Sequence, residues 1–530
     1  MKSVRIIYHL ARADFFERVR RYSFLVMLGL VVFLGYQSAI GNLALELGLY
    51  RGEFNSAWVG AMMSLIATSF IGWFGFYLVK GSVARDRETG VGQIMATTPL
   101  TRPLYLIGKW MSNFAVLMSM VTVLALGAIV IQFLQGENTQ INLFAFLSPF
   151  IFIAMPLMAL VAAAAVLFES VPFLKGGFGN IVYFFAFISL LPLFMENPAL
   201  KQYQAFEPTG LGLLANEMGK AVTAIYPEYN GDFSLGGGFV TSTRVFTWDG
   251  VQWTLELILA RFSLIALAIL LIFFAALFFD RFDPSRSKPR RTNTKRAASD
   301  LAPAPFDQTQ GKPVSTSQAL STVHLTPLNK AANRFSFFNV LMAEIKLLLK
   351  GQRWWWYVVM AGIITACLVN PSAAVREFAL PVAWVWPILI WSSIGNREIH
   401  NNVQQLTFSS ASPLLRQLPA QWLAGFIVTL LVSIGAIIRL TVDGDMAGLL
   451  ALLSGAFFIP SLALACGVWS GTSKLFEILY MLIWYLGPLN KLMELDYIGS
   501  HGNGRPEFFI PFSIVLIIIA FIGRARQIRT

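Results

Sequence analysis

The segment RDRETGVGQIMATTPLTRPLYLIGKW, residues 85–110, decides how the whole chain is interpreted. Together with Lys80 it brings five cations, two acids and two prolines into a short polar stretch between two long apolar runs. A polar stretch in such a place is expected to be a loop that joins two membrane helices. Its unusual density of charge and turn residues suggests a function beyond connection.

The composition places most of the chain in lipid. Of its 530 residues, 56% are hydrophobic and 13% are charged, and the mean hydropathy is +0.63. Soluble domains carry roughly 25% charged residues. We therefore expect an all-α polytopic membrane protein rather than several soluble domains.

A transmembrane helix needs about 20 mostly apolar residues, and twelve runs meet that requirement. They are predicted at 22–40, 57–80, 110–135, 144–168, 178–196, 253–279, 354–370, 378–395, 422–441, 446–471, 475–490 and 508–523. An even number of spans returns the chain to the side on which it began.

The distribution of cations orients the spans. Lysines and arginines gather in the first 21 residues, in the loop after the second run and at the C-terminus, whereas loops 41–56 and 136–143 contain few. Cation-rich loops stay in the cytoplasm, so both termini are predicted there, in an inner or plasma membrane. The net charge of +12 then follows from topology and does not indicate nucleic-acid binding. No cleavable signal peptide is evident.

The chain divides into two halves that resemble each other. Residues 1–280 and 336–530 are each predicted to form six spans preceded by an amphipathic helix in the headgroup plane. RETGVGQIMATTPLTR at 87–102 is echoed by REIHNNVQQLTFSSASPLLR at 397–416, and Trp110 and Trp422 follow at the start of the third span. The repeat is parallel, with the same orientation in both halves.

The segments outside the spans differ in length and composition. Residues 281–335 are rich in basic residues, Pro, Ser and Thr, and are predicted to be a disordered cytoplasmic linker. The external loop 197–252 is long, whereas its counterpart 491–507 is short. We expect the long loop to contain an amphipathic helix near 211–226.

A search for catalytic or ligand-binding motifs finds little. The chain lacks a GxxxxGK[ST] phosphate loop and HExxH or GxSxG motifs. Its two cysteines lie inside predicted spans and its four histidines are far apart, so neither a disulfide framework nor a metal site is expected. No charge is predicted in the middle of the membrane, which disfavours proton coupling and favours an external energy source.

The pattern after Thr89 predicts a short amphipathic helix. Val91, Ile94 and Met95 follow at i, i+3 and i+4, and Pro99 ends the helix. Pro103 suits the first turn of the next helix. Such a helix between two spans is suited to docking on a cytoplasmic partner; the alternative is a loop that binds lipid headgroups. The second copy of the pattern favours docking.

This segment resembles the loop between the second and third spans of ABC-2 type permeases, with its charged run, Glu-x-Gly, Thr-x-Pro-Leu-x-Arg and Gly-Lys-Trp. The six-span halves, the N-terminal interfacial helix and the large external loop fit the same resemblance. It implies that the loop is a coupling helix seated on a separate ATPase subunit, which binds the ATP and Mg that this chain itself does not. Two ATPase copies or a related pair are expected, and an additional extracytoplasmic subunit is a further expected partner.

The resemblance implies a set of coupling residues in each half. In the first half they are Arg85, Asp86, Arg87, Glu88, Gly90, Val91, Ile94, Met95, Pro99 and Arg102; in the second they are Arg397, Glu398, Val403, Leu406, Pro413 and Arg416. The second half departs from the pattern, because Glu398-Ile399-His400 replaces the Glu-x-Gly.

Two other functions remain as alternatives. A secondary carrier of the major facilitator type also has twelve spans and a central linker, but GSVARDRETG at 81–90 is only a near match to its G-x-x-x-D-R-x-G loop. A membrane scaffold without transport activity is the second alternative. Export is favoured over import, because no EAA-x-x-x-G loop is found.

Overall fold

The computed structural model describes residues 2–135, 137, 140–195, 200–237, 244–282, 336–350, 352, 354–410, 412–489, 492–501 and 504–529. It is a mainly helical protein whose apolar helices fit a membrane protein. All but the first two residues of the predicted linker 281–335 lie outside the described part.

Helices occupy each of the twelve predicted apolar runs. In the first half these are α2 (Tyr22–Ala39), α3 to α4 (Ser56–Ile66, Ala67–Ile71 and Gly72–Val79), α7 (Arg102–Gln135), α8 to α9 (Leu143–Pro149, Phe150–Ala154 and Met155–Ser170), α10 (Gly177–Met195) and α12 (Leu255–Phe278). In the second half they are α14 (Trp354–Val369), α15 to α17 (Ser372–Ala374, Val375–Ala379, Leu380–Val385 and Ile388–Trp391), α20 and α21 (Pro413–Val432 and Ile434–Val442), α22 (Met446–Ser470), α23 (Lys474–Trp484, continued by Tyr485–Leu489) and α24 (Pro506–Arg529).

Seven helical stretches in the described ranges are long and apolar enough to cross a membrane. They are Ser56–Glu88, Arg102–Leu134, Leu143–Ser170, Leu255–Phe278, Pro413–Val432, Met446–Ser470 and Pro506–Arg529. The pair Val4–Val19 and Ser23–Ala39 passes the same test together but is bent by 74°. The remaining predicted spans are shorter or interrupted helices, as in the second span of the second half, where Pro381 and Pro387 lie in a broken helix.

A helix precedes the first predicted span of each half. α1 (Lys2–Val19) packs along α7, and α13 (Phe337–Leu349) packs along α20. Leu10, Phe15 and Val19 of α1 are half-buried and pack against the cores of the first half. The buried residues of α1 also include Asp14 and Arg18, because these two charged side chains find partners inside the protein.

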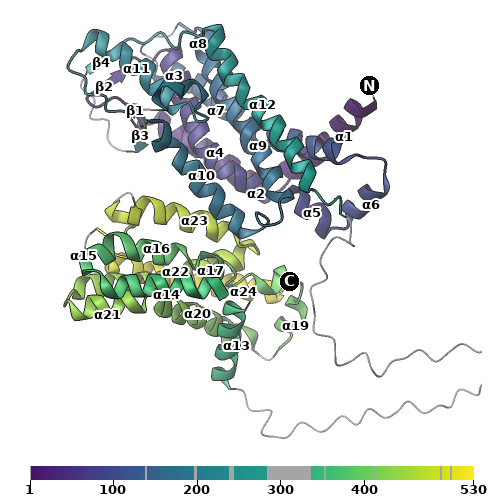
Figure 1. Ribbon diagram of the computed structural model, residues 1–530, viewed down its shortest axis with the longest axis vertical. Coiled ribbons are helices and arrows are strands. Elements are labelled where there is room, and N and C mark those ends of the chain that lie inside the picture. The colour runs from purple at the N-terminus through teal and green to yellow at the C-terminus, as the bar shows by residue number, and fades with distance from the viewer. Residues whose placement is uncertain are drawn as a thin grey trace, which may run out of the picture.

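The end of the first half opposite α5 and α6 contains strands, which the all-α prediction missed (Figure 1). β1 (Leu43–Glu46) pairs antiparallel with β3 (Ser234–Gly237), with Leu43 opposite Gly237. β2 (Tyr50–Gly52) pairs parallel with β4 (Arg244–Phe246). Each sheet joins loops almost 200 residues apart, and such short strands have no periodic signal of their own. The amphipathic helix predicted near 211–226 is present as α11 (Leu211–Ile225).

The two halves have separate cores that meet along α4, α10 and α23. Phe184 of α10 belongs to the core of the second half, and Trp73 of α4 packs against both cores. Trp73 and Phe184 both contact Tyr485, which follows α23. Near one end of this contact, Asn180 donates a hydrogen bond to the buried carboxylate of Glu477. Figure 1 shows the purple-to-teal half and the green-to-yellow half facing each other across α10 and α23.

Candidate functional site

The predicted docking loop of the first half consists of two short helices. α5 (Ser82–Glu88) and α6 (Val91–Thr97) are joined through Gly90, whose φ of +75° is the left-handed conformation that glycine adopts without strain. The short helix predicted after Thr89 is therefore present, and α7 begins at Arg102 with Pro103 in its first turn, as expected.

The second half carries a shorter version of this loop. α18 (Arg397–His400) and α19 (Gln404–Phe408) precede α20, which begins at Pro413. Figure 1 shows α5, α6 and α19 at the same end of the molecule, together with α1 and α13. The predicted loops of both halves thus point to the same side.

Apolar side chains stand on the outside of both loops. Val91 is 40% and Ile94 68% exposed, and in the second half Val403 is 40% and Leu406 77% exposed. Met95 is half-buried. The other predicted residues on these helices or beside them are exposed or half-buried: Glu88, Gly90, Pro99, Arg102, Pro413 and Arg416.

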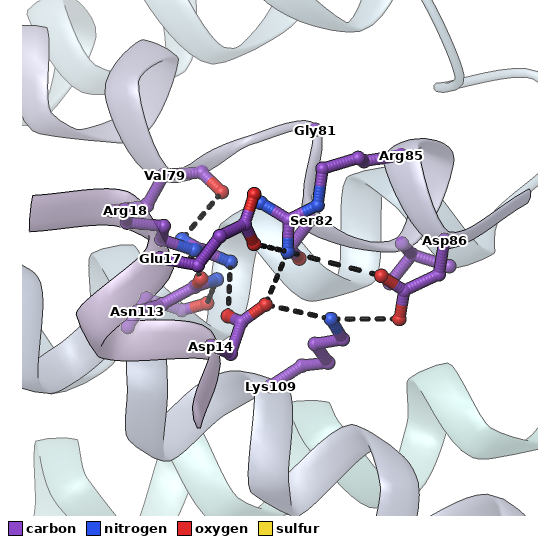
Figure 2. A network of polar contacts seen from close by, with 12 residues as sticks. Asp14, Glu17, Arg18, Val79, Gly81, Ser82, Arg85, Asp86, Lys109 and Asn113 are labelled. Atoms are coloured by element: carbon purple, nitrogen blue, oxygen red, sulfur yellow. Dashed lines mark hydrogen bonds and ion pairs between the residues drawn. The ribbon is translucent and has the colours of Figure 1, made fainter. Parts of the chain in front are cut away.

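A buried network of charges fastens α5 to α1 and α7 (Figure 2). The guanidinium of Arg85 lies 2.5 Å from Asp14 Oδ1 and 2.8 Å from a carboxylate oxygen of Glu17. Lys109 Nζ lies 2.9 Å from Asp14 Oδ1 and 2.8 Å from Asp86 Oδ2. The side chains of Asp14, Asp86 and Lys109 are each no more than 6% exposed. Two cations thus bridge two buried acids, which compensates charges that would otherwise be costly to bury.

The network extends to the end of the second span. Arg18 forms an ion pair of 2.8 Å with Asp14, and it donates hydrogen bonds to Val79 O at 3.3 Å and Asn113 Oδ1 at 2.6 Å. Burial by itself raises the pKa of Asp14, but the cations of Arg18 and Lys109 outweigh it and hold that pKa well below its ordinary value. Asp14 is therefore a stable anion at neutral pH.

A second anchor holds the N-terminus of α5. The carboxylate of Glu169, at the end of α9, accepts hydrogen bonds from the backbone N–H groups of Gly81 to Ala84, including Ser82 at 3.0 Å and Val83 at 2.5 Å. The first N–H groups of a helix have no partner within the helix, and its N-terminus attracts negative charge. Glu169, which lies at the end of another helix, accepts hydrogen bonds from these N–H groups and places a negative charge at the N-terminus of α5.

The second half has a corresponding network with different residues. Arg397 pairs with Glu344 of α13, as Arg85 pairs with Asp14 of α1. Glu398 accepts hydrogen bonds from Gln417 at 3.1 Å and from Gln421, and its carboxylate lies 3.3 Å from Arg524. Burial raises the pKa of Glu344 above its ordinary value, Glu398 adds to the rise, and Arg397 opposes it.

These contacts correct the alignment of the two loops. The sequence pattern matched Arg87-Glu88 with Arg397-Glu398, but the ion pairs relate Arg397-Glu398 to Arg85-Asp86. The error has a simple cause: Arg-Asp-Arg-Glu presents two overlapping basic-acidic pairs, and sequence alone does not show which pair turns inward.

The predicted coupling residues therefore separate into two groups. Arg85, Asp86, Arg397 and Glu398 face inward and hold the loops, whereas the outer apolar residues are open to contact. The prediction did not include the residues that hold the inward-facing side chains of the loops: Asp14, Lys109, Glu169, Glu344 and Arg524. The sequence signal that could have found them is a charged residue among apolar ones, such as Asp14 four residues before Arg18.

Among the residues that the structure describes, no cluster of His, Cys, Asp and Glu has the arrangement of a metal site. Comparison with protein-family models, with curated proteins and with solved structures finds no match to the chain.

Proposed function

We propose that the chain is the membrane-spanning subunit of an ATP-binding cassette exporter of the ABC-2 type. In this proposal the two halves each contribute six spans, both termini and both loops lie in the cytoplasm, and separate ATPase subunits bind ATP and Mg. The ATPases dock on α6 and α19 and drive translocation through the membrane part.

The observation that carries the proposal is the contrast between the two sides of the first loop. Its outer side presents Val91 and Ile94 to solvent, while its inner side is fixed by Asp14, Lys109 and Glu169. A loop that only binds headgroups does not require so many buried charges. A loop that transmits force does, because a soft connection would absorb the movement of the partner.

The arrangement of the second half supports the same function. Leu406 of α19 is exposed, α19 lies at the same end of the molecule as α6 (Figure 1), and Arg397 ties the loop to α13. Two docking points fit two ATPase copies or a related pair. The sheets and α11 at the opposite end offer a surface to an additional extracytoplasmic subunit.

Co-purification from native membranes tests the proposal. A Walker-motif ATPase is expected in stoichiometric amount with the chain, and its ATPase turnover is expected to rise on association. Ile94→Glu and Glu88→Arg should each reduce association at least about tenfold, since they place unmatched charge in the interface. Lys220→Glu, at an exposed position of α11, is the control and should have no effect.

Two results contradict the proposal. One is transport by the purified chain alone in liposomes under a proton gradient, which supports the carrier alternative. The other is full ATPase association and stimulation in both Ile94→Glu and Glu88→Arg.

A further inference from the structure

The end of α12 returns to the loop of its own half. Directly after this helix, Asp280 accepts two hydrogen bonds from Arg87 Nη2, both 2.8 Å. Arg281 donates a hydrogen bond of 2.8 Å to Thr98 O, just beyond α6. The ring of Phe282 packs on Gly92 of α6, where an added Cβ would lie 2.6 Å from the ring. Three consecutive residues after the sixth helix therefore hold the docking loop, Asp280 through α5 and the next two through α6.

The last helix of the second half makes a comparable contact. Arg524 of α24 lies 3.3 Å from Glu398 and donates a hydrogen bond of 3.1 Å to Gly395 O. Its guanidinium also lies over the ring of Phe408 in α19, 4.9 Å from the centroid. The sixth helix thus reaches the docking loop in both halves.

The two contacts use the same chemistry with the roles exchanged. In the first half the cation Arg87 belongs to the loop, and the acid Asp280 and the aromatic Phe282 follow the sixth helix; the guanidinium lies 5.9 Å from that ring. In the second half the cation Arg524 belongs to the sixth helix, and the acid and the aromatic belong to the loop. An ion pair together with a cation–π contact is retained although neither position keeps its residue type.

The backbone of the first-half contact is in an uncommon conformation. Arg281 and Phe282 have φ values of +52° and +61°, in the left-handed region that bulky side chains rarely adopt. Such a conformation persists only when surrounding contacts determine it, and it is frequent at positions under functional constraint. Here the contacts are the bond to Thr98 and the packing of Phe282 on Gly92, Tyr105 and Phe279.

We propose that Asp280, Phe282 and Arg524 are positioning residues that couple the sixth helix of each half to its docking loop. A partner that moves α6 then moves α12 together with α5 and α7, and a partner that moves α19 moves α24. This inference rests on the proposed function for the identity of the partner, but the contact itself is a property of this chain.

Asp280 and Phe282 allow a clean test in the first half. Asp280 and Arg87 are 26% and 44% exposed, so their pair adds little to global stability and Asp280→Asn is expected to fold. Arg524 is only 4% exposed and pairs with buried Glu398, so its loss would also disturb folding. The test therefore uses substitutions of Asp280 and Phe282 in the first half.

Hydrogen exchange of the purified chain in nanodiscs tests the contact without any partner. Asp280→Asn should speed exchange of the α6 amides about two- to fivefold, and Phe282→Ala should speed it more. The exchanged pair Arg87→Asp with Asp280→Arg should restore slow exchange. Glu228→Gln removes an exposed ion pair with Arg244 at the opposite end and is the control. Unchanged exchange in both Asp280→Asn and Phe282→Ala overturns the inference.

The complex with the co-purified ATPase then tests coupling. Asp280→Asn and Phe282→Ala should leave the binding constant unchanged within about twofold and reduce the stimulation of ATPase turnover, and the exchanged pair should restore it. Full stimulation with altered exchange shows that the contact is structural and overturns the positioning role. If no ATPase co-purifies while exchange responds as expected, the proposed function fails and the contact between helix and loop stands.

Discussion

Lys109 and Gln421 occupy the same place in the two halves and differ in charge. Each directly precedes a tryptophan whose indole N–H bonds to the fourth predicted span of its half: Trp110 to Ala159 O and Trp422 to Ser461 Oγ, both 2.9 Å. Lys109 pairs with two carboxylates, whereas Gln421 donates a hydrogen bond to one. At this position the first loop is thus fastened by a cation and the second by an amide.

Lys109→Gln should therefore weaken the first half. The substitution leaves Asp14 and Asp86 buried with one cation fewer, and breaking a buried ion pair in this way costs about 3–5 kcal/mol. Thermal unfolding in detergent should show a clear fall in Tm. Lys220→Gln removes an exposed i,i+3 pair and should change the stability by less than about 0.5 kcal/mol. Equal stabilities of the two variants would contradict the role assigned to Lys109.

Asp14 of α1 and Glu344 of α13 should make the stability of the protein depend on pH in opposite directions. The pKa of Asp14 is lowered by folding, so its contribution is present above its unfolded pKa of about 3.9 and is lost as the pH falls toward the folded value. The pKa of Glu344 is raised by folding, so its contribution declines as the pH rises from about 4.3 through the folded value. Asp14→Asn should flatten the acid limb of a Tm–pH profile, and Glu344→Gln should flatten the decline above it. If both variants change the Tm–pH profile in the same way, the opposite contributions assigned to Asp14 and Glu344 are wrong.

Glu169→Gln should loosen the start of α5. A neutral amide retains one acceptor oxygen but loses the attraction to the helix N-terminus, which costs about 1–2 kcal/mol. Hydrogen exchange at Ser82 to Ala84 should increase, while exchange in α11 should not. Glu256→Gln, an exposed acid in the first turn of α12, provides the comparison and should have a smaller effect. If the α5 amides exchange equally slowly in Glu169→Gln and in the unmodified protein, Glu169 does not cap the N-terminus of α5.

Gly92→Ala should displace α6. The new methyl group would lie within 3 Å of the Phe282 ring, and overpacking of this kind costs about 1–3 kcal/mol. The matched control is Gly127→Ala in α7, where a Cβ meets nothing within 4 Å, so that alanine should stabilise the helix by about 0.5–1 kcal/mol. Opposite shifts in Tm are expected. A stabilising effect at both positions would mean that Phe282 does not pack on α6.

Much of the fold follows from local patterns in the sequence. The apolar runs predicted helices at twelve places, the spacing of Val91, Ile94 and Met95 predicted α6, and the amphipathic piece of the external loop predicted α11. In each case the signal lies within about 20 neighbouring residues, because helix formation and apolar burial depend on nearby side chains.

The missed features all depend on partners far along the chain. β1 and β3 are each too short to be periodic and exist only because they pair with each other. Asp14 has the polarity of a surface residue, yet Lys109, 95 residues away, makes its burial tolerable. Arg281, just after α12, bonds to Thr98 at the end of α6, 183 residues away.

The sequence by itself indicated a helical membrane protein, and it predicted two similar halves with a charged, turn-rich loop after the second apolar run of each. Only the tertiary structure decided which charges of that loop face inward, which partners neutralise them, and that the sixth helix holds the loop. The physical reason is that apolar periodicity reports how a residue meets its solvent, whereas a buried charge is stabilised by a specific opposite charge whose position depends on the folded chain.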